Sequence, residues 1–450
     1  MRNVTAAAQN SETEFLVNDG SAAEAFDVIV LGAGISGLVS ASMLQKQGYR
    51  RIVVVDEYAQ LGGNHIDRGI GDYTFDIGSL IFQDDSPLLA HLPELLPLYV
   101  EINPSWGRLN PQGVVTEYPI SVKDDIVAAG PVEWVRLALS VLFARIFRSR
   151  LRNARDFAEY WIGARLLRRS GLENYMLRFY GVSAEQIDLE FAEKRMLWLK
   201  EQASPRNAFR RLVRSPEKAA TNKQLARPRE GFAYLYEVGA QRLKLGGVTF
   251  RLGEKMARLR KNDGGFLLQL GERSVSAKRV VSTIPLEHAQ SLCDIPAGSS
   301  LQSVTLISLF FSFSGERGFG QSVLYNFSDT GAWKRLTVYS DFYGLSGGRE
   351  YFAAEVNADH VGGSVDVAAE DFRRHTAENG LFNGDLKLEG SHTLANAYPV
   401  YTNNAAERAA SAIAALREFG VESLGRQGGF EYQPTARDTT IKAERALGGN

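Results

Sequence analysis

A glycine-rich turn between two apolar runs constrains this chain more than any other feature. Residues 26–57 read FDVIVLGAGISGLVSASMLQKQGYRRIVVVDE, in which Gly32, Gly34 and Gly37 form a G-x-G-x-x-G turn. The run DVIVL precedes the turn, helical residues follow it, and the run RIVVVD ends in Asp56, 19 residues after Gly37. The bare pattern is weak evidence, but strand, turn, helix and second strand in this order predict a Rossmann β-α-β unit that binds a dinucleotide.

Each residue of this unit has a physical task. Gly32 permits the tight turn, Gly34 lets backbone N–H groups approach a pyrophosphate, and Gly37 lets helix and strand pack closely. The helix N-terminus adds partial positive charge for the phosphates. An acid at position 56 suits ribose hydroxyls and disfavours a 2′-phosphate. An ordinary βα turn without a ligand is the weaker interpretation. The predicted dinucleotide contacts are Gly32, Gly34, Ile35, Ser36, Gly37, Asp56 and Glu57.

Composition narrows the class of protein and its partners. A chain of 450 residues is too long for one simple core, so two intertwined domains are expected. The net charge of −1 gives no reason to expect a nucleic acid partner. The single cysteine, Cys293, excludes an internal disulfide and favours a reducing compartment. No cluster of Cys and His has zinc spacing, so no metal is expected.

The N-terminal lead and the apolar runs bear on where the protein acts. Residues 1–24 lack the basic and apolar regions of a secretory signal and are expected to be disordered. No apolar run reaches the roughly 18 residues that span a bilayer. The longest approach, residues 132–147, is interrupted by Glu133, Arg136 and Arg145. These features favour a soluble, cytoplasmic protein.

Two further segments indicate which dinucleotide is bound. The stretch AQLGGNHIDRG has a Gly-Gly pair just beyond the second strand, and ESLGRQGGFEYQPTARDTTIKAERAL lies near the end of the chain. Both resemble the flavoprotein group that includes amine oxidases, protoporphyrinogen oxidases and UDP-galactopyranose mutases. The resemblance implies that FAD is the cofactor and that Arg426 meets it; the alternative for Arg426 is a surface turn. The implied further FAD contacts are Gly62, Gly63, Asn64, Gly425, Arg426 and Tyr432.

The order of helical and strand patterns predicts an α/β fold in several pieces. A discontinuous Rossmann-type FAD-binding domain is expected from residues 25–85, 225–290 and 415–450. A second, mixed substrate domain fills the gaps. It comprises a helical subdomain at 86–224, rich in arginine, and an antiparallel, sheet-rich part at 291–414.

The middle of the chain resembles one member of the group more than the others. Residues 155–197 are similar to the helical substrate domain of UDP-galactopyranose mutases, on the residues Tyr175, Tyr180-Gly181 and Lys194-Arg195. The segments WKRLTVYSDF and NAYPVYTNN extend the likeness and contain Arg335 and Tyr398. The resemblance implies that Tyr175 and Tyr180 stack on a nucleotide. It further implies Arg195, Arg335 and Tyr398 as catalytic-site residues, with guanidinium forks meeting a diphosphate.

The tyrosines and arginines of this region also have ordinary structural interpretations. Tyrosines at helical spacing often belong to a core, and arginines in a helical stretch often coat a solvated surface. The arginines of residues 136–169 are expected at the surface, which leaves open a face toward an anionic membrane or a second subunit, including a homodimer. Tyr180 replaces the tryptophan that the mutases carry, which keeps a stacking surface but makes it smaller.

Two departures from the mutase pattern concern the sugar pocket. Leu80 and Gln83 stand where the mutases carry histidines, and the run SVTLISLFFSF lacks their strand arginine. His65, next to the Gly-Gly turn, either approaches the flavin or is a loop residue. The resemblance therefore implies an altered sugar pocket.

Three functions remain in competition at this point. The leading one is a mutase-like enzyme of polysaccharide biosynthesis that acts on a nucleotide-linked sugar through reduced flavin. The alternative is an oxidoreductase of the amine oxidase or protoporphyrinogen oxidase type. The third is a flavin-binding scaffold without turnover. An NAD-dependent dehydrogenase fits the first turn, but the segment GRQGG argues against it.

Overall fold

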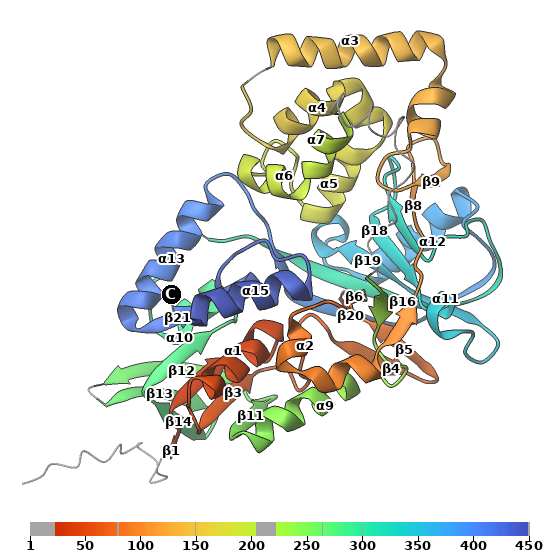
Figure 1. Ribbon diagram of the computed structural model, residues 1–450. Helices are drawn as coiled ribbons and strands as arrows, with labels where there is room; N and C mark the ends of the chain where they lie inside the picture. The colour runs from red at the N-terminus through yellow and green to blue at the C-terminus, as the bar shows by residue number, and fades with distance from the viewer. Residues whose placement is uncertain are drawn as a thin grey trace, which may run out of the picture.

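A five-stranded parallel sheet forms the base of the molecule (Figure 1). The computed structural model describes residues 23–78, 81–148, 150–203, 222–262, 264–298 and 300–448. The strand order is β11 (Val248–Leu252), β3 (Ile52–Asp56), β2 (Val28–Leu31), β15 (Arg279–Ser282) and β21 (Val421–Ser423), and every pair is parallel. Strands β2 and β3 read as continuous apolar runs because both faces of this sheet are covered.

The two faces of the parallel sheet pack against different layers. Val28 and Val30 of β2 face a core formed with helices α1 (Ile35–Lys46), α9 (Phe232–Leu245) and α15 (Ala436–Leu447). Ile29 and Leu31 face the other core, which includes α10 (Leu286–Leu292) and α13 (Ala405–Phe419). The alternation follows from the period of two in a strand. The expected Rossmann-type α/β fold is thereby confirmed.

A four-stranded sheet joins this second core. Its order is β1 (Glu24–Ala25), β14 (Arg273–Ala277), β13 (Gly265–Leu270) and β12 (Met256–Asn262). Strand β1 corrects the end of the expected disordered lead, because Glu24 pairs with Val275. The rest of that lead, up to residue 22, lies outside the described residues.

Small elements connect the base to the rest of the chain. They are the hairpin β4 (Asp67–Ile70) and β5 (Tyr73–Asp76), the sheet β6 (Phe82–Gln83), β10 (Gln224–Ala226) and β7 (Val100–Ile102), the helix α2 (Leu88–His91) and the 3-10 turn η1 (Pro93–Leu98). Residues 73–83 thus contain two short strands, β5 and β6.

A seven-stranded sheet forms the second layered unit, seen on the right of Figure 1. Its order is β20 (Phe382–Pro399), β16 (Ser303–Arg317), β19 (Glu350–Asn357), β18 (Trp333–Val338), β17 (Val323–Asn326), β8 (Trp106–Leu109) and β9 (Val115–Glu117). Helix α12 (Val365–Glu378) covers one face through Phe372, which stacks with Phe311. The smaller elements beside it are α11 (Ser340–Tyr343) and η4 (Ala358–Val361).

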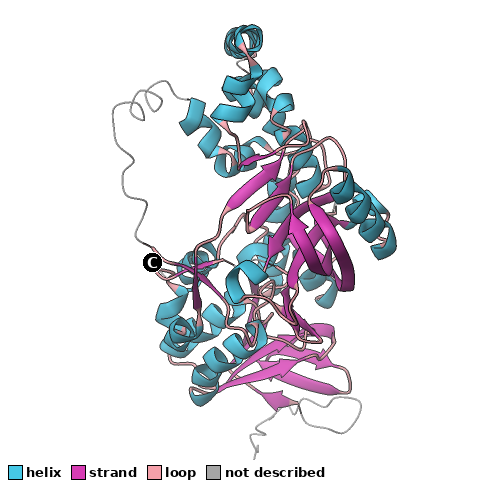
Figure 2. Ribbon diagram, turned by 90° about the vertical axis from the view of Figure 1, so that its right-hand side faces the viewer, coloured by secondary structure: helices cyan, strands magenta, loops and turns pink. Residues whose placement is uncertain are grey.

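The helices of the middle region stand at the end of the molecule opposite the parallel sheet (Figures 1 and 2). They are α3 (Pro131–Phe147), α4 (Ala154–Arg169), α5 (Leu172–Tyr180), α6 (Leu189–Arg195) and α7 (Leu197–Ala203), preceded by the turns η2 (Val122–Ile126) and η3 (Val127–Ala129). Within the expected helical subdomain, residues 131–169 contain two separate helices, α3 and α4. Helix α4 is itself kinked at Gly163, whose φ is 78°.

Candidate functional site

A large open cleft lies at the carboxyl ends of β2 and β3. Its empty volume is about 1430 Å³, and its walls come from three distant parts of the chain. Ligands of parallel α/β sheets bind at this edge. The predicted contacts that line the cleft are Gly32, Gly34, Ile35, Ser36, Asp56, Glu57, Gly62, Gly63, Asn64 and Arg426. Residues that the sequence did not indicate also line it, among them Thr283, His288, Asn396 and Thr439.

The glycine-rich turn is fixed by contacts that exclude side chains. Gly32 has a φ of 101°, a conformation that L side chains rarely adopt. A Cβ on Gly37 would lie 1.9 Å from the carbonyl oxygen of Gly32, so the helix can approach the turn only with glycine there. Gly37 therefore lies behind the turn and does not line the cleft. Its role is the close packing that the sequence predicts for the third glycine.

Two more glycine turns pack against the first one. Gly34 and Gly62 form a parallel bridge, and a Cβ on Gly63 would lie 2.9 Å from the Cα of Gly34. A Cβ on Gly425 would lie 2.5 Å from Ser36 Oγ. This contact brings the short helix α14 (Gly425–Gly428) against the start of α1. The first two turns thus present glycine backbone to the cleft, whereas the predicted contact Gly425 lies behind the third turn and does not line the cleft.

Asp56 holds the glycine-rich turn in place through hydrogen bonds to backbone N–H groups. Its Oδ2 accepts a hydrogen bond from the Ala33 N–H at 2.6 Å, and its Oδ1 accepts from the Tyr58 N–H at 2.9 Å. Burial raises the pKa of Asp56. The carboxylate lines the cleft as well, so its remaining lone pairs face any ligand there. Glu57 beside it accepts from the Met256 N–H at 3.1 Å.

Arg426 supplies positive charge to the cleft. Its Nε and Nη2 donate to the Gln433 carbonyl at 3.0 and 2.7 Å, which fixes the guanidinium. Among the described residues, no carboxylate forms an ion pair with it. Tyr432, predicted as a cofactor contact, does not line the cleft, because its ring packs on Phe191 and Tyr401 instead.

Asn64 and His65 tie the Gly-Gly turn to two other elements. Asn64 Nδ2 donates to the Ala397 carbonyl at 2.5 Å, and His65 Nδ1 lies 2.6 Å from the Tyr236 hydroxyl. The His65 ring also stacks on Phe232 at 5.1 Å. Burial lowers the pKa of His65 to about 4, so the ring is neutral. His65 thus both lines the cleft and anchors its own loop.

A second cavity of about 440 Å³ lies among the helices of the middle region. The predicted residues Tyr175, Tyr180 and Arg195 line it, together with Tyr118, Phe191 and Trp198. The lining is mainly aromatic and apolar, with Arg195 as its cation. No carboxylate forms an ion pair with Arg195 within the described part of the chain. The Tyr175 hydroxyl is buried and has no hydrogen-bond partner there.

Aromatic rings in mutual contact extend from this cavity toward the sheets. Tyr175 meets Tyr325 edge-on at 5.6 Å, and Phe179 stacks on Tyr398 at 5.1 Å. Phe191 stacks on Tyr401 at 4.5 Å. These contacts join α5 and α6 to β17, to the end of β20 and to the segment that follows it. The aromatic rings therefore connect the cavity to the part of the chain that carries Asn396 in the cleft wall.

Arg335 is held by a partner that the sequence did not reveal. Strand β18 has a bulge between Trp333 and Arg335, so that Lys334 and Arg335 both lie against Glu355 of β19. Lys334 Nζ lies 3.1 Å from a carboxylate oxygen of Glu355 and donates to the Tyr398 hydroxyl at 2.6 Å. Arg335 forms an ion pair with the other carboxylate oxygen of Glu355 and reaches the Gly78 carbonyl at 3.4 Å.

The charged groups of this buried cluster shift one another's pKa values. Burial lowers the pKa of Lys334 to about 8. Glu355 is buried too, but Arg335 and Lys334 hold its pKa below the ordinary value. Tyr398 donates its hydroxyl hydrogen to the Phe179 carbonyl at 3.0 Å, so its oxygen is oriented to accept from Lys334. Nothing in the sequence pattern marked Lys334 or Glu355.

By resemblance, Leu80 and Gln83 stand where the mutases carry histidines. Leu80 lies outside the described residues, and Gln83 lies in β6, where it pairs with Gln224. Gln83 is exposed and does not line the cleft. In the part of the chain that the structure describes, no group of His, Cys, Asp and Glu is arranged to hold a metal ion.

The fold and the cleft together define the class of proteins with a Rossmann-type dinucleotide-binding unit. The model of the flavin-containing amine oxidoreductase family matches residues 35–340. The chain belongs to this family. It is accordingly an FAD-dependent enzyme.

Solved structures have the same fold at low sequence identity. A reduced UDP-galactopyranose mutase is 16% identical, with a TM-score of 0.73 over 94% of each chain. A protein from Exiguobacterium sp. 255-15, provisionally assigned as a protoporphyrinogen oxidase, is 16% identical with a TM-score of 0.71, over 95% of this chain and 99% of its own. A putrescine oxidase variant is 15% identical with a TM-score of 0.60, over 95% of this chain and 98% of its own. A search of curated protein sequences finds no match.

Proposed function

We propose that the cleft at the parallel sheet holds FAD. The residues present fit this group: glycine turns at Gly32 to Gly34 and at Gly62-Gly63 expose backbone, and the start of α1 adds the positive end of a helix. Asp56 and Arg426 add one carboxylate and one guanidinium to the walls. When bound, FAD supplies a ring that exchanges electrons with a substrate or, once reduced, acts as a nucleophile.

We further propose that the enzyme is mutase-like and acts on a nucleotide-linked sugar in the second cavity. One observation carries this proposal: Arg195 lies in an aromatic-lined cavity with no carboxylate partner among the described residues. Arg195 is partly buried, and a partly buried cation without a counter-ion has a desolvation cost that an anionic ligand would offset. Tyr175 and Tyr180 offer flat faces for a nucleobase beside it.

The charges nearby suit a diphosphate. Lys334 and Arg335 carry two positive charges against the single carboxylate of Glu355, which leaves one positive charge in excess. Together with Arg195, this region has two positive charges in excess, matching the two negative charges of a diphosphate diester. Lys334 and Glu355 act as positioning residues in this scheme, because they orient Tyr398 and Arg335.

A second candidate is an oxidoreductase of the amine oxidase type. The cluster of Lys334, Arg335 and Glu355 also supports this candidate. Glu355 already neutralises Arg335. The buried Lys334, with a pKa of about 8, can hold or release a proton near neutral pH. The neutral lysine would then accept a proton from a cationic amine substrate.

Titrations of the purified holoenzyme separate the two candidates. For a mutase-like enzyme, UDP perturbs the flavin absorbance, and a nucleotide sugar is isomerised only after the flavin has been reduced, without oxygen uptake. For an amine oxidase type, an amine bleaches the oxidised flavin and oxygen is consumed. If neither UDP nor any nucleotide sugar alters the flavin spectrum in either redox state, the mutase-like proposal is wrong.

A further inference from the structure

Helix α3 carries its apolar residues on the side that faces away from the protein. Each of six large apolar residues is more than half exposed, and all lie on one side of the helix at helical spacing: Val132, Val135, Leu139, Leu142, Phe143 and Ile146. Only Leu137 and Ala144 of this helix are buried. A surface helix of a globular protein normally shows the reverse arrangement, with its apolar stripe toward the core.

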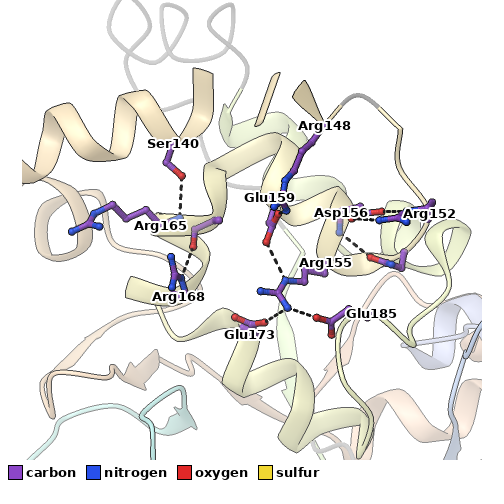
Figure 3. A network of polar contacts seen from close by, with 12 residues as sticks. Ser140, Arg148, Arg152, Arg155, Asp156, Glu159, Arg165, Arg168, Glu173 and Glu185 are labelled. Atoms are coloured by element: carbon purple, nitrogen blue, oxygen red, sulfur yellow. Dashed lines mark hydrogen bonds and ion pairs between the residues drawn. The ribbon is translucent and has the colours of Figure 1, made fainter. Parts of the chain in front are cut away.

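The inward side of α3 is held by polar contacts instead. Glu133 forms ion pairs with Arg165 of α4, and Ser140 Oγ accepts from the Arg165 N–H at 3.1 Å. Arg145 Nε donates to the Tyr160 carbonyl at 2.8 Å, and its guanidinium lies over the Trp161 ring at 4.5 Å. Figure 3 shows how Ser140 and Arg148 point toward α4 in this network. These contacts fix the helix so that its apolar side faces outward.

The surroundings of α3 are strongly basic. Residues 131–169 contain nine arginines and three acids, in a chain whose net charge is −1. The three acids are all paired with arginines: Glu133 with Arg165 and, at 3.7 Å, with Arg136; Asp156 with Arg152; and Glu159 with Arg155 and Arg148. Arg136, Arg150 and Arg168 remain exposed beside the apolar side of the helix or on the adjoining segments. An exposed apolar face in a segment where arginines outnumber acids nine to three matches the interfacial region of an anionic bilayer.

We propose that α3 docks the enzyme on an anionic lipid surface, lying in the interface with its apolar side in the lipid. Helix α3 lies at the extreme end of the molecule, so a flat surface can reach it without obstruction by other described elements (Figures 1 and 2). In this orientation α4 to α7, which line the second cavity, lie between the lipid surface and the parallel sheet (Figure 1).

The enzyme lies on the bilayer rather than across it. In the described part of the chain, no single helix is long and apolar enough to span a membrane. Residues 122–129 and 131–147 pass that test only as a pair bent by 113°. The ion pair between Glu133 and Arg165 keeps the inner side of α3 on the protein, where lipid cannot surround it.

Flotation of the holoenzyme with vesicles tests the proposal. Binding is expected to vesicles of equal parts phosphatidylcholine and phosphatidylglycerol, and to be much weaker with phosphatidylcholine alone. The double variant Leu139→Glu, Leu142→Glu is expected to abolish binding. The matched control is Leu245→Glu, because Leu245 of α9 is 91% exposed at the opposite end of the molecule; this variant should bind like the parent. Unchanged flavin content shows that each variant is folded.

The basic residues give an independent measurement. Arg136→Ala and Arg150→Ala should each weaken binding to the anionic vesicles by roughly fivefold, with a smaller effect in high salt. Failure of the parent protein to bind anionic vesicles overturns the proposal. If the parent is then a dimer that Leu139→Glu, Leu142→Glu converts to a monomer, the face is a contact with a second copy. If it is a monomer, another segment of this chain covers the face.

Discussion

Arg195 is the residue on which the proposed substrate class depends most. Its guanidinium has aromatic neighbours and no carboxylate partner in the described ranges, whereas Arg335 is committed to Glu355. The sequence indicated both arginines through the same resemblance and could not tell them apart. The difference lies in strand pairing, since Glu355 stands opposite Arg335 only because β18 and β19 are neighbours.

Replacing Arg195 tests its role directly. Arg195→Gln removes charge-assisted hydrogen bonds, which contribute about 1.5–3 kcal/mol each, so UDP affinity should fall roughly tenfold to hundredfold. Arg195→Lys, which keeps the charge but not the fork, should lie between. The measurement is the change in flavin absorbance during UDP titration. Arg168→Gln, at an exposed position of α4, is the control and should leave the affinity unchanged. An unaltered affinity in Arg195→Gln would count against the nucleotide site.

The titration of Lys334 should make ligand affinity or activity depend on pH, in opposite directions for the two candidate functions. Burial lowers its pKa from 10.5 to about 8, so the side chain loses its positive charge as the pH rises through 8. If the site binds a diphosphate, UDP affinity falls above that pH. If Lys334 accepts a proton from an amine substrate, kcat/KM for the amine rises instead. In Lys334→Met either break near pH 8 should disappear. A break that persists in this variant assigns the titration to another group.

Contacts between elements explain what the sequence could and could not predict. The β2–α1–β3 unit was predictable because Gly32 and Gly37 are required by the turn itself, whatever the rest of the chain does. Strand β20 was not predicted, since Gly384, Gly390 and several charged residues interrupt its apolar pattern, yet it pairs along β16. The bulge that aims Lys334 and Arg335 at Glu355 has no local sequence pattern either. The polar inner side of α3 depends on contacts with α4, which the helical pattern of α3 alone does not contain.

Close packing of α1 on the glycine turn predicts the effect of a single methyl group. In Gly37→Ala the new Cβ would lie 1.9 Å from the Gly32 carbonyl oxygen, so the helix or the turn must shift. Overpacking of this kind costs about 1–3 kcal/mol, and the displaced turn should retain less FAD. The ratio of flavin to protein after purification and the melting temperature measure both effects. Gly69→Ala in β4 is the control, because a Cβ on Gly69 would meet no atom within 4 Å. Full flavin retention in Gly37→Ala would contradict the packing argument.

The whole molecule is organised around a cleft whose walls come from residues 32–65, from the segment Met256 to His288, and from Leu394 to Thr439. These segments contribute strands to the same parallel sheet (β3, β15 and β21) and also reach β20 and the C-terminal helices, so a ligand in the cleft contacts elements that are far apart in the sequence. Binding to the folded state alone stabilises it by an amount set by ligand concentration, about 2.7 kcal/mol at one hundred times Kd.

Removal of FAD should therefore lower the melting temperature of the entire molecule, and added FAD should restore it. Arg426→Ala removes the guanidinium that the Gln433 carbonyl fixes in the cleft, so the apoenzyme of this variant should regain less thermal stability at the same FAD concentration. Arg437→Ala is the matched control, since Arg437 lies in the same C-terminal region but forms an exposed ion pair with Asp85. Differential scanning fluorimetry over a range of FAD concentrations separates the two variants. If both regain the same stability, Arg426 does not contact the cofactor, and the positive charge of the cleft must act through the backbone at the start of α1.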